Sequence, residues 1–69
     1  MISYTKLWIR LLEKGMTKQQ LAKAAGFSLS TLTKLNNNKY VAMSVLVKIC
    51  KVLKWDIGDV MEVIIGNEV

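Results

Sequence analysis

The sequence contains no histidine and a single cysteine, Cys50. A disulfide framework needs pairs of cysteines, and thiolate or imidazole metal sites need clusters of cysteine and histidine, so one chain can build neither. No nucleophile or proton donor has a recognisable base partner in the pattern. The sequence therefore predicts a protein that is not an enzyme and that holds no metal and no cofactor.

Proline is absent, and the 69 residues include only four glycines. Proline would break helix interiors, so its absence suits a mostly helical chain. No apolar run approaches the roughly 20 residues needed to span a membrane, and the first residues lack the pattern of a secretory signal peptide. We therefore expect one cytoplasmic domain, residues 1–69, with no membrane contact and no small-molecule substrate.

Acidic residues are scarce in most of the chain. Residues 1–54 carry all ten lysines and arginines but only one acid, Glu13, which gives a net charge of +9, whereas residues 55–69 carry four acids and a net charge of −4. A chain with one basic and one acidic end attracts an anionic partner to one end only. Nucleic acid fits this pattern best, and an ordinary lysine-rich surface is the alternative.

The segment from Thr17 to Lys39 has the signals of two short helices joined by a tight turn. Thr17, with Gln20 three residues later, fits a capping box at the start of the first helix. Gly26 can adopt the positive φ that ends a helix sharply, and Ser28 fits the N-cap of the second helix. The break is therefore about three to four residues long, which is the spacing of a helix-turn-helix.

The second helix of this pair has two different faces. Placing successive residues 100° apart puts Leu32 and Leu35 inward. The opposite face then carries hydrogen-bonding side chains of modest length, which suit base edges and phosphates in a major groove. These side chains belong to Ser30, Thr33, Lys34 and Asn37. A solvated polar face without a function is the alternative interpretation of the same pattern.

The segment before the pair predicts a helix that begins near Ser3 or Tyr4 and ends at Gly15. Its apolar residues recur at the spacing of one helix face. They are Tyr4, Leu7, Trp8, Leu11 and Leu12. The position of Trp8 in this stripe favours core packing over a stacking platform for bases. On the opposite face, Lys6 and Arg10 either reach a phosphate or only keep the surface soluble.

Two more helices are predicted after the pair. One runs from about Met43 to Leu53, and its stripe places Cys50 inward as a small hydrophobe rather than as a redox-sensing thiol. Asp56, with Asp59 three positions later, begins the last helix. The predicted core stripe of that helix consists of Ile57, Val60, Met61 and Ile64.

The end of the chain is strongly apolar. Residues 63–65 are too β-branched and too apolar for a solvent-exposed tail. They either pair as a strand with residues 1–4 or cover the same surface in a second copy of the chain. The second option predicts a homodimer that contacts its partner through Met61, Val63 and Ile65.

Together these segments resemble a known family. MTKQQLAKAAGFSLSTLTKL resembles the helix-turn-helix of the phage repressor and Cro type, the xenobiotic-response-element-like regulators, and CKVLKWDIGDVMEV resembles their closing helices. Ala22, Gly26 and Leu32 occur together at the spacing that lets the two helices cross closely. The resemblance implies an all-α, compact five-helix, lambda-repressor-like DNA-binding domain with its motif at residues 17–36. A short pairing of N- and C-terminal strands is compatible with it.

The resemblance also implies a function and a set of contacts. The chain would be a sequence-specific transcriptional regulator, acting as a repressor, that inserts helix 28–37 into the major groove of double-stranded DNA as a two-fold dimer. The implied base-reading residues are Leu29, Ser30, Thr31, Thr33 and Lys34. The phosphate contacts expected with this docking are Thr17, Lys18, Asn37 and Lys39.

Two positions depart from the family pattern. Lys18 stands where glutamine is common, so it would meet a phosphate only as a flexible point charge. Leu29 stands where a polar reader is common, and it either packs on a thymine methyl group or covers the turn. Leu29 also leaves room for a second function, a protein-interaction or antitoxin-like module with the same fold. Nonspecific coating of DNA is a third, which the charge permits.

Overall fold

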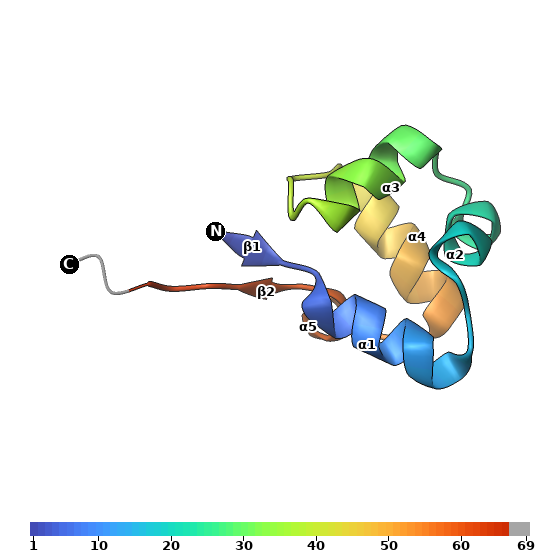
Figure 1. The fold of residues 1–69 in the computed structure, drawn as a ribbon, viewed down its shortest axis with the longest axis horizontal. Helices are drawn as coiled ribbons and strands as arrows, with labels where there is room; N and C mark the ends of the chain where they lie inside the picture. The colour runs from blue at the N-terminus through green and yellow to red at the C-terminus, as the bar shows by residue number, and fades with distance from the viewer. Residues whose placement is uncertain (67–69) are drawn as a thin grey trace.

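The computed structural model describes residues 1–66, so the predicted domain boundary at residue 69 lies outside the described residues. In chain order the elements are β1 (Ile2–Ser3), α1 (Thr5–Lys14), α2 (Lys18–Ala25), α3 (Leu29–Asn36), α4 (Met43–Leu53), α5 (Ile57–Val60) and β2 (Glu62–Val63). Figure 1 shows α4 in the middle of the body, between α2 and α3 on one side and α1 and α5 on the other. The five-helix prediction is confirmed. None of the described helices has the length and apolarity to cross a membrane.

The boundaries of the helix pair follow its capping residues. The Thr17 hydroxyl accepts the Gln20 N–H at 3.0 Å, and the Gln20 side chain accepts the Thr17 N–H at 2.8 Å, which completes the predicted capping box. Gly26 ends α2 at a φ of 77°, a conformation that glycine adopts without steric cost. Ser28 then caps α3 by accepting an N–H of its first turn. The predicted turn between the two helices is confirmed.

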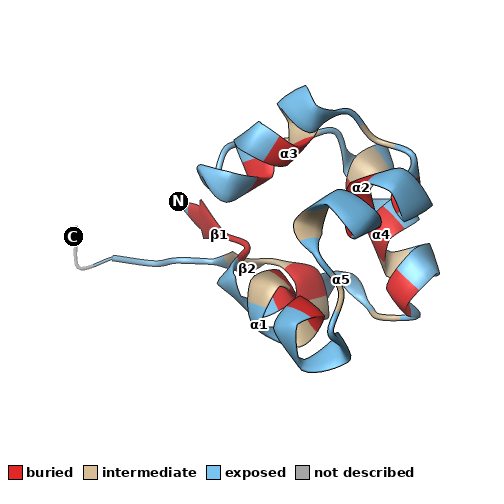
Figure 2. Ribbon diagram, turned by 45° about the vertical axis from the view of Figure 1, so that its right-hand side comes forward, coloured by how far each residue is buried: buried red, intermediate tan, exposed pale blue. Residues whose placement is uncertain are grey.

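Every helix contributes at least one fully buried aliphatic side chain to a single core. These side chains are Leu7, Leu21, Leu35, Ile49 and Val60. Figure 2 shows buried segments on several helices and on β1 rather than on one element. Burying one such side chain stabilises the fold by roughly 1.5–3 kcal/mol. This core therefore fixes where α2 and α3 lie relative to the rest of the chain.

Three residues of the predicted core stripes are not buried. Leu12 is 81% exposed, because α1 packs along a narrow stripe through Leu7 and Leu11 and Leu12 lies one helical step away from it. Ile57 and Ile64 are 37% and 41% exposed. The last helix has only four residues and the backbone is extended from Met61 onward, so helical spacing does not apply to Ile64. These three assignments are wrong.

The two ends of the described chain form an antiparallel pair. Ile2 lies opposite Val63 and Ser3 opposite Glu62, and the Ile64 N–H donates to the Met1 carbonyl at 2.8 Å. The predicted pairing of the terminal strands is therefore confirmed. The apolar tail nevertheless stays uncovered in a single chain, since Val63 is 64% exposed and Ile65 is 87% exposed. Figure 1 shows β2 and residues 64–66 leading away from the body.

Arg10 connects α1 to the start of α5. One guanidinium nitrogen lies 3.0 Å from a carboxylate oxygen of Asp59, and the guanidinium carbon lies 5.2 Å from the centroid of the Trp55 ring. The Lys6 ammonium donates to the carbonyl of Gly58 at 3.4 Å. The Arg10 side chain is 42% exposed and thus joins α1 to α5 through a partly exposed ion pair, a contact that the sequence did not indicate.

Candidate nucleic-acid interface

The outer face of α3 is polar and open to solvent. Leu32 and Leu35 are buried against the body, whereas Ser30, Thr33 and Lys34 are exposed, as the helical spacing predicted. The Thr33 hydroxyl donates to the carbonyl of Leu29 at 3.1 Å, so its oxygen remains able to accept from a base. A helix with such a face fits the width of a DNA major groove.

The first residues of α3 differ in accessibility. Leu29 is 67% exposed, so it does not cover the turn, and Phe27 packs against the core there instead. Of the two predicted roles of Leu29, only contact with a thymine methyl group is compatible with this exposure. Thr31 is half-buried, and its hydroxyl oxygen lies 3.2 Å from the hydroxyl oxygen of Ser28. Thr31 is thus less open to solvent than the other predicted base readers.

Lys18, the first residue of α2, is held by two neighbours. Its ammonium donates to the side-chain oxygen of Asn36 at 2.7 Å and lies 4.3 Å from the centroid of the Trp8 ring. An ammonium over an indole ring gains about 0.5–1 kcal/mol at an exposed site. The sequence indicated neither contact, and it predicted a flexible side chain where the structure places a held one. Trp8 packs against the core with the rest of its surface, as predicted.

The N-terminus of α2 is a second feature that favours an anion. The N–H groups of the first helical turn have no partner within the helix, and the helix dipole places partial positive charge there. Thr17 uses its hydroxyl oxygen for the capping box and is exposed, so its O–H can still donate outward. Thr17 and Lys18 therefore present an O–H, a charge and backbone N–H groups from one corner of the motif.

The loop between α3 and α4 carries the other two predicted phosphate contacts. Asn37 ends α3, and its amide donates to the Thr33 carbonyl at 3.0 Å. Asn38 in this loop adopts the left-handed conformation, with a φ of 54°. The N–H of Lys39 returns to the Lys34 carbonyl at 2.9 Å. The turn is tight, and the side chains of Asn37 and Lys39 are exposed.

The lysines of this surface are not neutralised by the protein. Within residues 1–66, the one ion pair joins Arg10 to Asp59, so no carboxylate pairs with Lys18, Lys34 or Lys39. Phosphate contacts in protein–DNA complexes come largely from such free cations, whose binding releases counterions from the DNA. Within the described residues, the charges of these three lysines are therefore left for an anionic partner.

Cys50 has the character of a packed side chain rather than of a reactive thiol. It is half-buried against the core. Burial, together with the neighbouring carboxylates of Asp56 and Asp59, raises the pKa of the thiol, which disfavours the thiolate that redox chemistry needs. In the described part of the chain, no cluster of three or more histidine, cysteine or acidic side chains could hold a metal ion.

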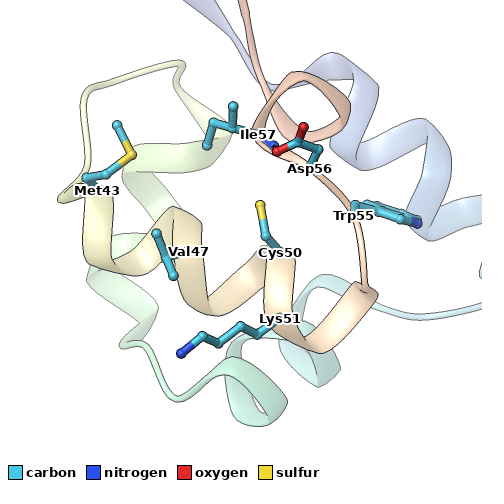
Figure 3. Close-up of a pocket in the computed structure, with 7 residues that line it drawn as sticks. All are labelled: Met43, Val47, Cys50, Lys51, Trp55, Asp56 and Ile57. Atoms are coloured by element: carbon cyan, nitrogen blue, oxygen red, sulfur yellow. The ribbon is translucent and has the colours of Figure 1, made fainter.

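A groove between α4 and α5 was missed by the sequence analysis (Figure 3). It has a volume of about 360 Å³ and is lined by Met43, Val47, Cys50, Lys51, Trp55, Asp56 and Ile57. Most of the lining is apolar, and Met43 and Val47 are 62% and 45% exposed. Met43 and Val47 lie four residues apart on the solvent side of α4. This spacing of apolar residues was the sequence signal that could have indicated the groove.

Comparison with known proteins agrees with this architecture. The crystal structure of the transcriptional regulator VanUg, form II, matches with a TM-score of 0.86 at 44% sequence identity, over 88% of this chain and 81% of that chain. The search of curated proteins found no match. The profile of the Cro/C1-type helix-turn-helix DNA-binding domain matches residues 6–65, a span that contains the five helices except for Thr5, the first residue of α1. The chain therefore belongs to the Cro/C1-type helix-turn-helix DNA-binding family.

Proposed function

We propose that this chain is a sequence-specific transcriptional regulator that acts as a repressor and inserts α3 into the major groove of double-stranded DNA. The observation that carries the proposal is the exposed polar face of α3, with Lys18 and Lys39 beside its last turn and paired with no carboxylate of residues 1–66. The similar protein VanUg is itself described as a transcriptional regulator. A domain seated on a promoter excludes other proteins from the same DNA, which supports repression.

The proposed contacts divide into two groups. Base edges are read from the start and the outer face of α3. The residues are Leu29, Ser30, Thr31, Thr33 and Lys34. Phosphates are held by the N-terminus of α2 and by the loop after α3. The residues are Thr17, Lys18, Asn37 and Lys39. The first group sets the preferred sequence, and the second sets the position of the protein on the duplex.

Repeated selection of the purified protein on a random duplex library tests this function. At ~150 mM salt, purely electrostatic binding is already weakened, so enrichment reports base recognition. We expect one short motif to be enriched. A library that stays random after several rounds would contradict sequence-specific binding. The Lys48→Ala variant, which removes a lysine from the outer face of α4, serves as a control for charge loss outside the motif.

We also propose that two copies associate through the apolar tail. Met61 is half-buried, whereas Val63 and Ile65 are largely exposed, and β2 leaves the body with one edge unpaired. The groove of a second copy offers an apolar floor for this tail, and its Lys51 complements the acidic Glu62 beside the tail. Two-fold association would place two reading helices about 34 Å apart, as in other repressor dimers.

Cys50 gives a direct test of this association because it lines the groove (Figure 3). Under mild oxidation at slightly alkaline pH, Ile65→Cys should form a disulfide with Cys50 of a second copy, since such a bond needs Cα atoms within about 7 Å. Two copies of the double variant Ile65→Cys, Cys50→Ala can form a disulfide only between their two residues at position 65. Peptide mapping distinguishes the two linkages. Products linked only through position 65, or a protein that stays monomeric at tens of micromolar, would refute docking in the groove.

The protein-interaction or antitoxin-like module remains the second candidate function. The groove and the 67% exposure of Leu29 on the reading face favour it, because contiguous apolar surface commonly marks a protein contact. A stoichiometric partner that co-purifies with the chain while no DNA is retained at physiological salt would support this function against the first.

A further inference from the structure

Tyr4 joins the start of the chain to the loop between α3 and α4. Its hydroxyl donates to the carbonyl of Lys39 at 2.8 Å, and its backbone N–H donates to the side-chain oxygen of Asn38 at 3.1 Å. The side chain is only 1% exposed. Two consecutive loop residues are thus bonded to one residue that lies 34 and 35 positions earlier in the sequence.

These bonds add long-range contacts to a turn that local backbone bonds already shape, since the Asn38 N–H donates to the Leu35 carbonyl at 3.2 Å and the Lys39 N–H to the Lys34 carbonyl at 2.9 Å. Asn38 has a φ of 54°, in a region that residues other than glycine seldom occupy. Its side-chain bond to Tyr4 favours that conformation. The hydroxyl of Tyr4 fixes the next peptide unit through the Lys39 carbonyl, and with it the point from which the Lys39 side chain projects.

We propose that Tyr4 is a positioning residue for DNA binding, which sets the α3–α4 loop so that Lys39 meets the phosphate backbone. The inference rests on the proposed function, because it takes the Lys39 side chain as a phosphate contact. Tyr4 itself is buried and does not touch DNA. Its role is to hold in the free protein the loop shape that binding requires, so that little ordering is left to occur on binding.

Tyr4→Phe separates this role from core packing. The phenyl ring keeps the buried contacts, and only the hydrogen bond to the Lys39 carbonyl is lost. We expect the affinity for the selected duplex to fall about three- to tenfold and the slope of log affinity against log salt to shrink by about one, because one phosphate contact is no longer held. The preferred sequence should not change. A lower melting temperature with an unchanged salt slope would overturn the proposal.

A double-mutant cycle with Lys39→Gln shows whether Tyr4 acts through the loop. If it does, adding Tyr4→Phe to Lys39→Gln should weaken binding by less than about twofold further, because coupled residues are not additive. An equal loss in both backgrounds would overturn the proposal. Asn38→Gly provides a second route if Tyr4→Phe folds poorly. This variant keeps the positive φ, removes the acceptor for the Tyr4 N–H and should lower the salt slope in the same way.

The same measurements separate failure of this inference from failure of the proposed function. If Lys39→Gln and Asn37→Ala weaken binding but Tyr4→Phe and Asn38→Gly do not, the positioning role is wrong and the phosphate contacts stand. If Lys39→Gln and Asn37→Ala leave both affinity and salt slope unchanged, the phosphate contacts are wrong, and the role of Tyr4 falls with them.

Discussion

Lys18 stacks on Trp8, with its ammonium 4.3 Å from the ring centroid and 2.7 Å from the side-chain oxygen of Asn36. Trp8 belongs to α1, Lys18 to α2 and Asn36 to α3, so these contacts join three helices at the Lys18 ammonium. A cation at a helix N-terminus is unfavourable, since the dipole places positive charge there as well. The ring and the amide offset part of that cost. The remaining positive potential is suited to a phosphate.

Lys18→Gln should therefore separate DNA binding from stability. The melting temperature should change little, because the repulsion from the helix dipole disappears together with the ring contact. The affinity for DNA should fall, and the salt slope should decrease by about one. Titrations of a labelled duplex at several salt concentrations measure both quantities. Lys48→Gln is the matched control, and an equal effect of that variant would show only a loss of net charge.

Lys34 and Ser30 should respond differently to truncation. Lys34→Ala should weaken binding by a similar factor on every sequence and reduce the salt slope by about one if the side chain meets only a phosphate. Ser30→Ala should instead change which base is preferred at one position of the site, since a base contact carries discrimination of about 1–3 kcal/mol. Selection with each variant reads out the preferred sequence. Unaltered binding by both variants would remove them from the interface.

Gly26→Ala should destabilise the fold through the backbone alone. An added Cβ would have no heavy atom within 4 Å, but the φ of 77° is unfavourable for alanine. We expect the free energy of unfolding to fall by about 1–2 kcal/mol. For a domain of this size, each kcal/mol lowers the melting temperature by roughly 4–8 °C. Asn should cost less than Ala at this position. Gly58→Ala has equal space and no positive φ, so thermal unfolding of that variant should show no loss.

Tyr4 should make the fold sensitive to alkaline pH. Burial, and then the nearby Tyr40, raise the pKa of the Tyr4 hydroxyl above its ordinary value of about 10. The folded state thus holds this proton more tightly than the unfolded state. The stabilising contribution of Tyr4 is complete below about pH 10 and is lost as the pH rises through the folded pKa.

The measurement is urea unfolding at about pH 9, 10 and 11 for the wild type and Tyr4→Phe. Lysines titrate in both proteins, so the difference between the two curves isolates Tyr4. The wild type should lose its advantage over Tyr4→Phe as the pH rises. A difference between wild type and Tyr4→Phe that stays constant with pH would contradict this assignment.

The parts of the fold that follow local rules were predictable from the sequence. The capping pair Thr17 and Gln20, the positive φ of Gly26 and the N-cap Ser28 each depend on residues within one turn, and all were predicted and confirmed. The inward face of α3 also followed from helical spacing. The membership of the Cro/C1-type family rests on a match over residues 6–65, which includes these residues.

The remaining features depend on neighbours that the sequence does not name. Leu12 has the same chemistry as Leu11, and only the position of α5 beside α1 decides which is buried. The Lys18 contact with Trp8 and the Tyr4 contact with Lys39 join different elements, and no local pattern indicates them. The base and phosphate contacts themselves stay predictions, because they depend on a duplex.

The pairing of β1 with β2 has a consequence for how the protein is made. β1 precedes all five helices and its partner β2 follows them, and Arg10 is likewise made well before Asp59. The helix pair in between is complete earlier, because its own caps and turn are local. On the ribosome, therefore, α2 and α3 would acquire their secondary structure first, and the domain would close only after β2 has emerged.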